Sequence, residues 1–223
     1  MMLYVLSGTI PSRARILDLG CGTGSLSERV LARFPRARVV AVDYDPVLLQ
    51  IGRTGLGNAG GRLTWVDADL RTSDWATALP RGRFDAAVTS TAMHWLTTAE
   101  LGRLYRILGR TIRPGGIFLN ADHIASGRST PRLRKILGRA ARERGKAHPP
   151  PPGERWSDWW GSVLADPSFA VEAKLHRARF PRAHRRTQTA DLPGHVNQLR
   201  RAGFREVGVV WSRGQNRIVA AVR

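Results

Sequence analysis

Residues 16–24 read Ile-Leu-Asp-Leu-Gly-Cys-Gly-Thr-Gly, an apolar run that ends in glycines at every second position. A helical pattern begins directly afterwards, at Ser25. Glycines between a strand and a helix allow the backbone to approach a ligand closely, because they carry no side chain. Three interpretations are open at this point: a nicotinamide dinucleotide site, an S-adenosylmethionine site, or a tight turn that binds nothing.

The spacing of the glycines favours S-adenosylmethionine over a dinucleotide. The dinucleotide fingerprint is G-x-G-x-x-G and places a pyrophosphate at the helix N-terminus. Gly20, Gly22 and Gly24 follow G-x-G-x-G instead. S-adenosylmethionine has no phosphate, and it needs room for its methionine tail and a carboxylate near its ammonium group. Asp18, just before the first glycine, is placed to supply that carboxylate.

Two more acids end the next two apolar runs. Asp43 ends the run 38–43, where an acid can bind both ribose hydroxyls. Asp67 ends the run 63–67 and precedes Ala68, and its carboxylate can accept a hydrogen bond from an exocyclic amine such as that of adenine. The ends of parallel strands meet in one crevice, so these acids together indicate a ligand site. Each acid alone is equally consistent with a helix N-cap or a strand-end turn.

His94 is the candidate for acid–base chemistry. It follows a fourth apolar run, 84–89, on the expected acceptor side, so it can remove a proton from a hydroxyl or ammonium acceptor. A carboxylate acceptor needs no base, and the alternative is that His94 packs or contacts the cofactor's tail. Asp122 and His123, after a fifth run, form a second pair at the same edge with the same two interpretations.

The elements that must position these residues alternate along the first two-thirds of the chain. Alternating strand-like and helical patterns predict βαβ units and a parallel sheet with helices on both faces. Asp45 is predicted to cap one helix before Pro46, and Thr97–Glu100 forms a capping box that starts another. Pro114-Gly115-Gly116 is expected to stop that second helix. The predicted strands are 15–19, 38–43, 63–67, 84–89 and 117–120, and 192–202 is a last helix.

The end of the chain predicts a hairpin, because apolar runs at 206–211 and 217–222 flank a short polar loop. Residues 123–190 break the alternation. They contain a basic helix candidate at 131–146, four prolines at 149–152, and an aromatic helix with Trp156, Trp159 and Trp160. We interpret 123–190 as a helical insertion that caps the functional edge of one domain spanning 1–223. The tryptophans can wall an acceptor pocket, although aromatic residues at helical spacing more often belong to a core.

Composition limits the function classes. The net charge of +19 comes almost wholly from arginine. It suggests either an anionic partner or a coding bias, and the scattered arginines favour the bias, with weak non-specific nucleic-acid binding as its consequence. No stretch has the length of a membrane span and no signal peptide is evident, so we expect a soluble cytoplasmic protein without a membrane partner. The oligomeric state stays open.

The sequence gives little support for a metal site or for a reactive cysteine. Cys21 is the only cysteine, which excludes internal disulfides and a cysteine-cluster metal site, and we interpret it as a small apolar residue of the glycine loop. His148, His176 and His184 have no convincing metal spacing, so no metal is expected.

These motifs resemble those of class I S-adenosylmethionine-dependent methyltransferases. Residues 17–24 resemble the family's motif I, 40–46 its second motif, 84–96 the segment after strand four, and 113–116 the turn before strand five. The closing segment 199–204 with its hairpin also fits. Within the family, His94-Trp95 and the tryptophan-rich insertion are most similar to small-molecule members related to trans-aconitate methyltransferase.

The resemblance implies an α/β fold: a Rossmann-like, doubly wound seven-stranded sheet in the order 3-2-1-4-5-7-6, with the last strand antiparallel. It implies S-adenosylmethionine as cofactor, and methyl transfer to oxygen, nitrogen or carboxylate of a small molecule. The residues expected to bind the cofactor are Asp18, Gly20, Cys21, Gly22, Thr23, Gly24, Asp43, Tyr44, Asp67, Ala68, Thr89 and Ser90.

Two alternative functions stay open. An RNA or protein methyltransferase is favoured by the net charge and by 131–146, although no Asn-Pro-Pro-Tyr or Asp-Pro-Pro-Tyr signature occurs and Cys21 is not placed to attack cytosine. A cofactor-binding protein without turnover is the other. Family members usually carry one or two helices before the first strand, whereas about a dozen residues precede Arg15.

Overall fold

A computed structural model describes residues 1–223 apart from 128–129, 148–152, 154 and 182–189, and it describes residue 134 without its side chain. His148, His184 and the four prolines at 149–152 lie outside the described residues.

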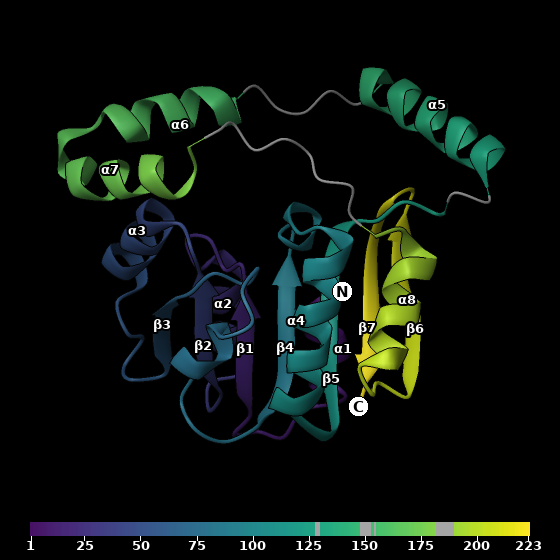
Figure 1. Ribbon diagram of the computed structural model, residues 1–223, viewed down its shortest axis with the longest axis horizontal. Coiled ribbons are helices and arrows are strands. Elements are labelled where there is room, and N and C mark those ends of the chain that lie inside the picture. Colours follow the sequence, from purple (N-terminus) through teal and green to yellow (C-terminus); the bar gives the residue numbers. More distant parts are fainter. Residues whose placement is uncertain (128–129, 148–152, 154, 182–189) are drawn as a thin grey trace.

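One sheet of seven strands forms the centre of the molecule, in the order β3-β2-β1-β4-β5-β7-β6 (Figure 1). The first five strands run parallel, and β7 is antiparallel to both β5 and β6. The predicted order and the antiparallel last strand are therefore confirmed. The strands are β1 (Arg15–Leu19), β2 (Arg38–Asp43), β3 (Leu63–Asp67), β4 (Phe84–Ser90), β5 (Ile112–His123), β6 (Glu206–Arg213) and β7 (Asn216–Val222).

Helices cover both faces of this sheet, as a doubly wound fold requires. Each face buries one cluster of apolar side chains, and Tyr105, Phe84, Phe118 and Phe204 are among the largest fully buried residues. The covering helices are α1 (Met2–Ser7), α2 (Ser25–Arg33), α3 (Pro46–Leu56), α4 (Thr98–Thr111) and α8 (Leu192–Arg201). Short 3-10 turns lie at η1 (Trp75–Ala78), η2 (Met93–Trp95) and η3 (Pro167–Phe169).

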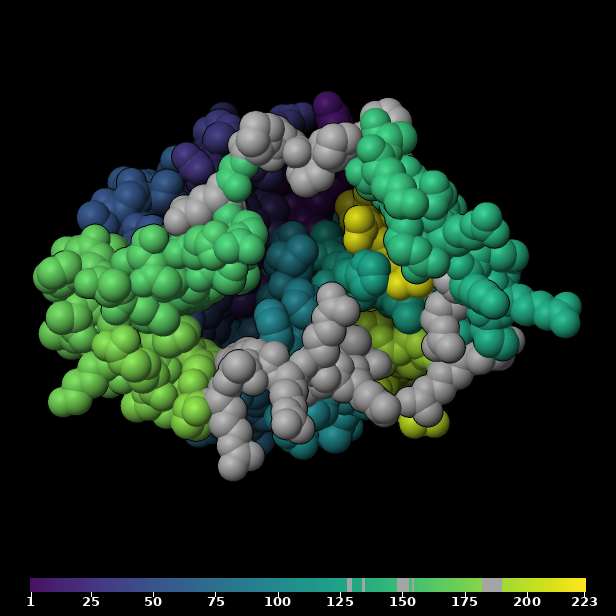
Figure 2. Space-filling view, turned by 90° about the horizontal axis from the view of Figure 1, so that it is seen from above, coloured from purple at the N-terminus to yellow at the C-terminus, as the bar shows by residue number. Residues whose placement is uncertain are grey.

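The insertion forms three helices, α5 (Pro131–Ala147), α6 (Trp156–Ala165) and α7 (Ala170–Arg179). In Figure 1 they lie above the ends of the parallel strands, and Figure 2, seen from above, shows the molecule hollowed between α5 and the α6–α7 pair. The three tryptophans of α6 contact one another but are not core residues, because α6 buries none of its side chains and Trp156 is 64% exposed.

The predicted helix starts are confirmed by their hydrogen bonds. The Asp45 carboxylate accepts from the backbone amides of Val47 and Leu48 at the start of α3. Thr97 and Glu100 form the reciprocal capping box of α4. Each cap satisfies backbone amides that have no partner inside the helix.

Three predicted boundaries are wrong. Helix α4 ends at Thr111, and Pro114-Gly115-Gly116 belongs to β5, because Gly115 and Gly116 exchange backbone hydrogen bonds with Arg223 after β7. Strand β5 therefore includes Asp122 and His123, which were predicted to follow the strand. The hairpin strands are also longer than predicted and leave only Gly214-Gln215 between them. Among the described residues, no helix combines the length and the apolar composition needed to cross a membrane.

Candidate active site

The glycine loop between β1 and α2 is closely packed at two of its three glycines. A Cβ atom on Gly20 would lie 2.4 Å from the Cβ of Ala92, and one on Gly24 would lie 2.5 Å from the ring of Trp65. A Cβ on Gly22 would meet nothing nearer than a Leu48 methyl at 4.0 Å. Gly20 and Gly24 are therefore needed for packing, whereas Gly22 faces space that a ligand can fill.

Asp43 fixes the shape of this loop. Its Oδ2 accepts a hydrogen bond from the amide of Gly22 at 2.7 Å, and its Oδ1 accepts from the amides of Tyr44 and Asp45. A carboxylate has about four acceptor positions, so Asp43 retains acceptor capacity for a ribose hydroxyl.

Asp18 is the most unusual acid of the edge. It is 1% exposed, and its Oδ2 accepts a hydrogen bond from the Ser27 hydroxyl at 2.6 Å. Its Oδ1 is buried and has no hydrogen-bond partner among the described residues. Burial raises the pKa of Asp18 to about 7, against the lowering effect of the Ser27 hydrogen bond. An unpartnered carboxylate oxygen at this place fits the ammonium group of S-adenosylmethionine.

The remaining loop residues have structural contacts. Cys21 is buried, its Sγ lies 3.6 Å from the Gly22 carbonyl, and burial raises its thiol pKa, so it is not a reactive thiolate. The Thr23 hydroxyl lies 3.5 Å from that of Ser25.

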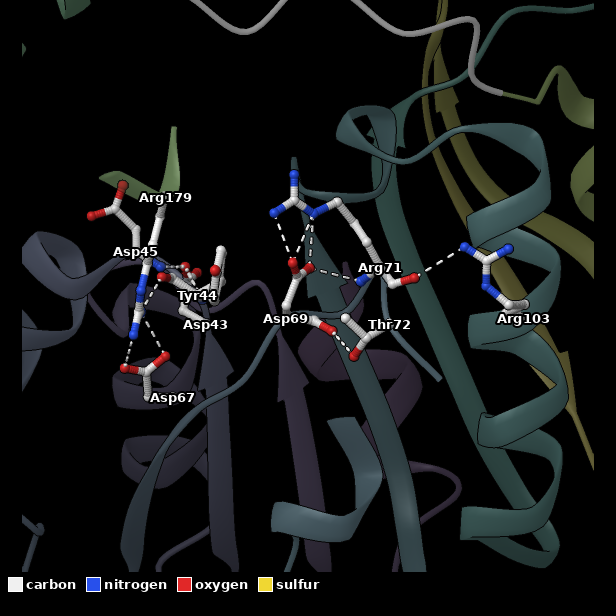
Figure 3. Close-up of polar contacts among 9 residues, drawn as sticks. All are labelled: Asp43, Tyr44, Asp45, Asp67, Asp69, Arg71, Thr72, Arg103 and Arg179. Atoms are coloured by element: carbon white, nitrogen blue, oxygen red, sulfur yellow. Dashed lines mark hydrogen bonds and ion pairs between the residues drawn. The ribbon is translucent and has the colours of Figure 1, made fainter. Parts of the chain in front are cut away.

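Asp67 is held by a residue that was not predicted. Arg179 of α7 donates to both of its carboxylate oxygens, at 2.7 and 3.0 Å, and donates as well to the carbonyl of Tyr44 (Figure 3). The guanidinium also lies 4.5 Å from the centre of the Tyr44 ring. Nearby on the same helix, His176 Nδ1 lies 2.8 Å from Asp45 Oδ2. Helix α7 is therefore attached to the ends of β2 and β3.

Asp69 is a second acid of this region that sequence reasoning missed. It binds Arg71 through both carboxylate oxygens, and in the view of Figure 3 it lies on the α4 side of Tyr44, whereas Asp67 lies on the other side. The Ala68 amide between the two acids donates to the Asp43 carbonyl. The alternation Asp67-Ala68-Asp69 was the available signal, and it leaves two candidates for the adenine amine.

His94 forms a pair with Asp122. Their Nδ1 and Oδ1 atoms are 2.8 Å apart, and the His94 amide donates to Oδ2 of the same carboxylate. Asp122 was expected to pair with His123, whose amide alone reaches it. Burial acts to raise the pKa of Asp122, but the hydrogen bonds and charge of His94 outweigh it, so the pKa is lowered and the group stays ionised. An ionised partner selects the Nδ1–H tautomer of His94, which leaves Nε2 as the basic nitrogen.

A cavity of about 940 Å³ lies beside this pair. His94, Asp122 and Ser90 line it, together with Trp211 and Arg217 from the hairpin. The tryptophans of α6 are not among its described lining residues. Thr89 is buried beneath this edge, and its hydroxyl has no partner among the described residues. The predicted residues thus form two groups, one at the ends of β1–β3 and one at the end of β4.

Comparisons with known proteins agree with the fold. The model of a methyltransferase domain family matches residues 16–116. Residues 16–116 thus match a methyltransferase domain, and the strand order is the one implied by the resemblance to class I S-adenosylmethionine-dependent methyltransferases. The domain includes the glycine loop, Asp18, Asp43 and His94, whereas Asp122 and the insertion follow it.

Relatives of the methyltransferase domain share about a third of its residues. An uncharacterized methyltransferase of Mycobacterium tuberculosis is 36% identical over 124 residues, which are 55% of this chain and 54% of that protein. A trans-aconitate 2-methyltransferase of Azoarcus is 36% identical over 104 residues, 47% of this chain and 37% of that protein. The matches thus span about half or less of these relatives.

Solved structures share the fold. An O-methyltransferase family protein from Burkholderia thailandensis superposes with a TM-score of 0.62 at 18% identity, over 100% of this chain and 55% of the other. Human N-acetylserotonin methyltransferase in complex with SAM gives a TM-score of 0.59 at 14% identity, over 100% of this chain and 50% of the other.

Proposed function

We propose that this protein transfers a methyl group from S-adenosylmethionine to a small molecule bound in the cavity beside His94. The His94–Asp122 pair carries the proposal, because it places an oriented base on the wall of a cavity at the edge that holds the glycine loop. The relatives named for methyl transfer support the reaction class, and one of them is named for trans-aconitate, a small acid.

The strand ends of β1–β3 divide the task of holding the cofactor. In this proposal Asp18 binds the ammonium group, Gly20–Gly24 make room for the methionine tail, and Asp43 accepts from the ribose. Tyr44, Ala68 and either Asp67 or Asp69 bind the adenine side, with Thr89 and Ser90 at the end of β4. The bound cofactor supplies an electrophilic methyl group on sulfur.

The residues around the cavity act on the acceptor. Asp122 holds Nδ1–H of His94, so Nε2 can take the proton from a hydroxyl or amine as it is methylated. Arg217 lines the same cavity, is 8% exposed, and donates to the Ile124 carbonyl and to the Ser126 hydroxyl. Burial lowers the pKa of this guanidinium. A buried cation is stabilised by an anion, so we propose an acceptor with a carboxylate near Arg217.

An RNA or protein acceptor is the alternative, and one observation favours it. The lysine and arginine side chains of α5 that the structure describes are exposed, and α5 lies at the rim of the hollow in Figure 2. Such a helix can contact an anionic macromolecule.

The test measures cofactor binding and acceptor choice separately. Calorimetry with S-adenosylhomocysteine should show one site, and NADH should give no heat. A panel of small carboxylic acids, hydroxy acids and amines is then incubated with labelled S-adenosylmethionine, next to RNA and protein extracts. Label in a small acid supports the proposal. Label only in RNA or protein supports the alternative, and binding without any labelled product rejects turnover.

A further inference from the structure

The edge of the sheet opposite the proposed active site, where the parallel strands begin, carries a second cavity. Its volume is about 400 Å³, and four arginines line it: Arg13, Arg36, Arg38 and Arg62. They belong to the segments that lead into β1, β2 and β3, so three separate parts of the chain contribute guanidinium groups to one place.

A repeated tripeptide supplies most of these arginines. The sequence Arg-Ala-Arg stands at the start of β1, at 13–15, and at the start of β2, at 36–38, while a third copy, 177–179, ends α7. The two central alanines at the strand starts, Ala14 and Ala37, are fully buried. Arg13 and Arg36, which precede these alanines in turns, and Arg38, which begins β2, are all exposed.

Backbone hydrogen bonds hold the segments side by side. The amide of Arg38 donates to the carbonyl of Ala14 at 2.9 Å, and the amide of Val39 donates to the carbonyl of Arg62 at 2.8 Å. The Arg62 side chain also donates to the Leu31 carbonyl, which fixes its position at the end of α2. Arg38 begins β2, and Arg13, Arg36 and Arg62 lie in the turns that lead into β1, β2 and β3, so these bonds hold the starts of the three strands side by side.

The cavity gathers positive charge without neutralising it. No carboxylate lines it, and within the described ranges no aspartate or glutamate pairs with these four arginines. Arg15 is different: it donates to the carbonyls of Pro80 and Arg83 and lies over the Phe84 ring, away from the cavity. Like charges held together repel one another, so an anion among the four would stabilise the fold.

We propose that this cavity binds a compact phosphate anion, such as pyrophosphate or tripolyphosphate. The planar guanidinium group binds phosphate oxygens in pairs, and several of them match an anion with several phosphoryl groups. No aromatic or apolar side chain lines the cavity among the described residues, so nothing there would recognise a base or a lipid tail. An extended nucleic-acid backbone is the less suitable ligand, because only one or two of its phosphates would fit in a cavity of this size.

The test is calorimetry with tripolyphosphate on the full chain at about 0.15 M salt, where non-specific contacts are screened. The cavity variant is Arg36→Gln with Arg38→Gln. The control is Arg142→Gln with Arg144→Gln on α5, two exposed residues whose loss changes the net charge equally. We expect the cavity variant to lose about tenfold or more in affinity and the control to keep it. Binding of S-adenosylhomocysteine should be unchanged in both, which shows that both are folded.

Three results would overturn the proposal. Equal loss in both variants would mean a general charge effect, and no binding by the wild type would mean no site. Binding of a single-stranded RNA that the cavity variant loses and tripolyphosphate does not displace would assign the cavity to nucleic acid. In phosphate-free buffer the cavity variant should melt no lower than the wild type, because repulsion is relieved.

Discussion

At the scale of single residues, the three predicted acids differ in what they contact. Asp43 is bound by backbone amides and Asp67 by Arg179, whereas Asp18 keeps one buried oxygen without a partner in the described part of the chain. Burial raises the pKa of Asp18 to about 7, and it also raises the pKa of Asp43. The unpartnered oxygen of Asp18 makes it the acid whose charge a bound ammonium group would stabilise most directly.

We expect S-adenosylmethionine to bind more tightly as the pH rises through about 7, because Asp18 must lose its proton to pair with the ammonium group. Calorimetry in buffers with different ionisation enthalpies would show a proton released on binding near pH 7. Asp18→Asn keeps the size and the Ser27 contact, and it should bind more weakly with a flat pH profile. An affinity in the wild type that does not change with pH would mean that Asp18 stays protonated in the complex.

Substitution of His94 should separate chemistry from binding. For a hydroxyl or amine acceptor, we expect His94→Ala to lower turnover by about 10²–10⁴-fold while cofactor affinity changes little. Asp122→Asn should also lower kcat and alter the pH–rate profile, because the amide no longer selects the Nδ1–H tautomer. His123→Ala is the control, since only the backbone of His123 contacts Asp122. A carboxylate acceptor would show little loss, and a parallel loss of cofactor binding would make His94 a cofactor contact.

At the scale of elements, the insertion is attached to the sheet by charged side chains. Arg179 reaches Asp67 and Tyr44, and His176 reaches Asp45. Partly exposed ion pairs are individually weak, and α7 is also held by the buried Ala173 and by the contact of the Phe180 ring with Tyr44.

Loss of the Arg179 contact should speed cofactor release. We expect Arg179→Ala to raise the dissociation rate of S-adenosylhomocysteine by up to about tenfold, because two charge-assisted hydrogen bonds that hold α7 over the strand ends are lost. Stopped-flow competition measures this rate. Arg177→Ala on the same helix is the control, as Arg177 is exposed. An unchanged rate for Arg179→Ala would show that α7 does not restrict the cofactor's exit.

The elements that could be predicted are those with local signals. Asp45-Pro46 and Thr97–Glu100 predict the starts of α3 and α4 from residues next to each helix. The alternation of apolar runs with helical patterns predicts the sheet. The predicted end of α4 was wrong because Gly115 and Gly116 form backbone hydrogen bonds with Arg223, which is far away in the sequence. The partners of His94 and Asp67 could not be predicted for the same reason, since tertiary structure alone brings Asp122 and Arg179 to them.

At the scale of the whole molecule, one buried pair should contribute a loss of stability on mild acidification. His195 Nδ1 lies 2.6 Å from the Tyr105 hydroxyl, and burial lowers the pKa of His195 from 6.5 to about 4. Below pH 6.5 His195 is protonated in the unfolded chain, whereas in the folded protein it is protonated only below about pH 4. Folding therefore loses stability between these values, by up to about 3 kcal/mol.

Asp18 acts in the opposite sense over a similar range, because its raised pKa destabilises the fold as the pH rises from about 4 to about 7. Chemical denaturation of the wild type and of His195→Phe at several pH values separates the two. Above pH 6.5 the free energies of unfolding of the two proteins should change with pH in parallel. Below pH 6.5 the wild-type value should fall more steeply than that of the variant. A parallel pair of curves down to pH 4 would show that His195 is protonated without cost.

In the proposed function the cofactor lies on β1–β3 and the acceptor on β4–β7. At the carboxyl ends of the paired strands β1 and β4, these two groups of residues meet where Gly20 packs against Ala92. Ala92 directly precedes the turn that carries His94. Because Gly20 has no side chain, Ala92 can pack directly against the glycine loop, and this contact sets the distance between His94 and that loop. Adding one methyl group there would push the two groups of residues out of alignment, although every residue that performs chemistry would still be present.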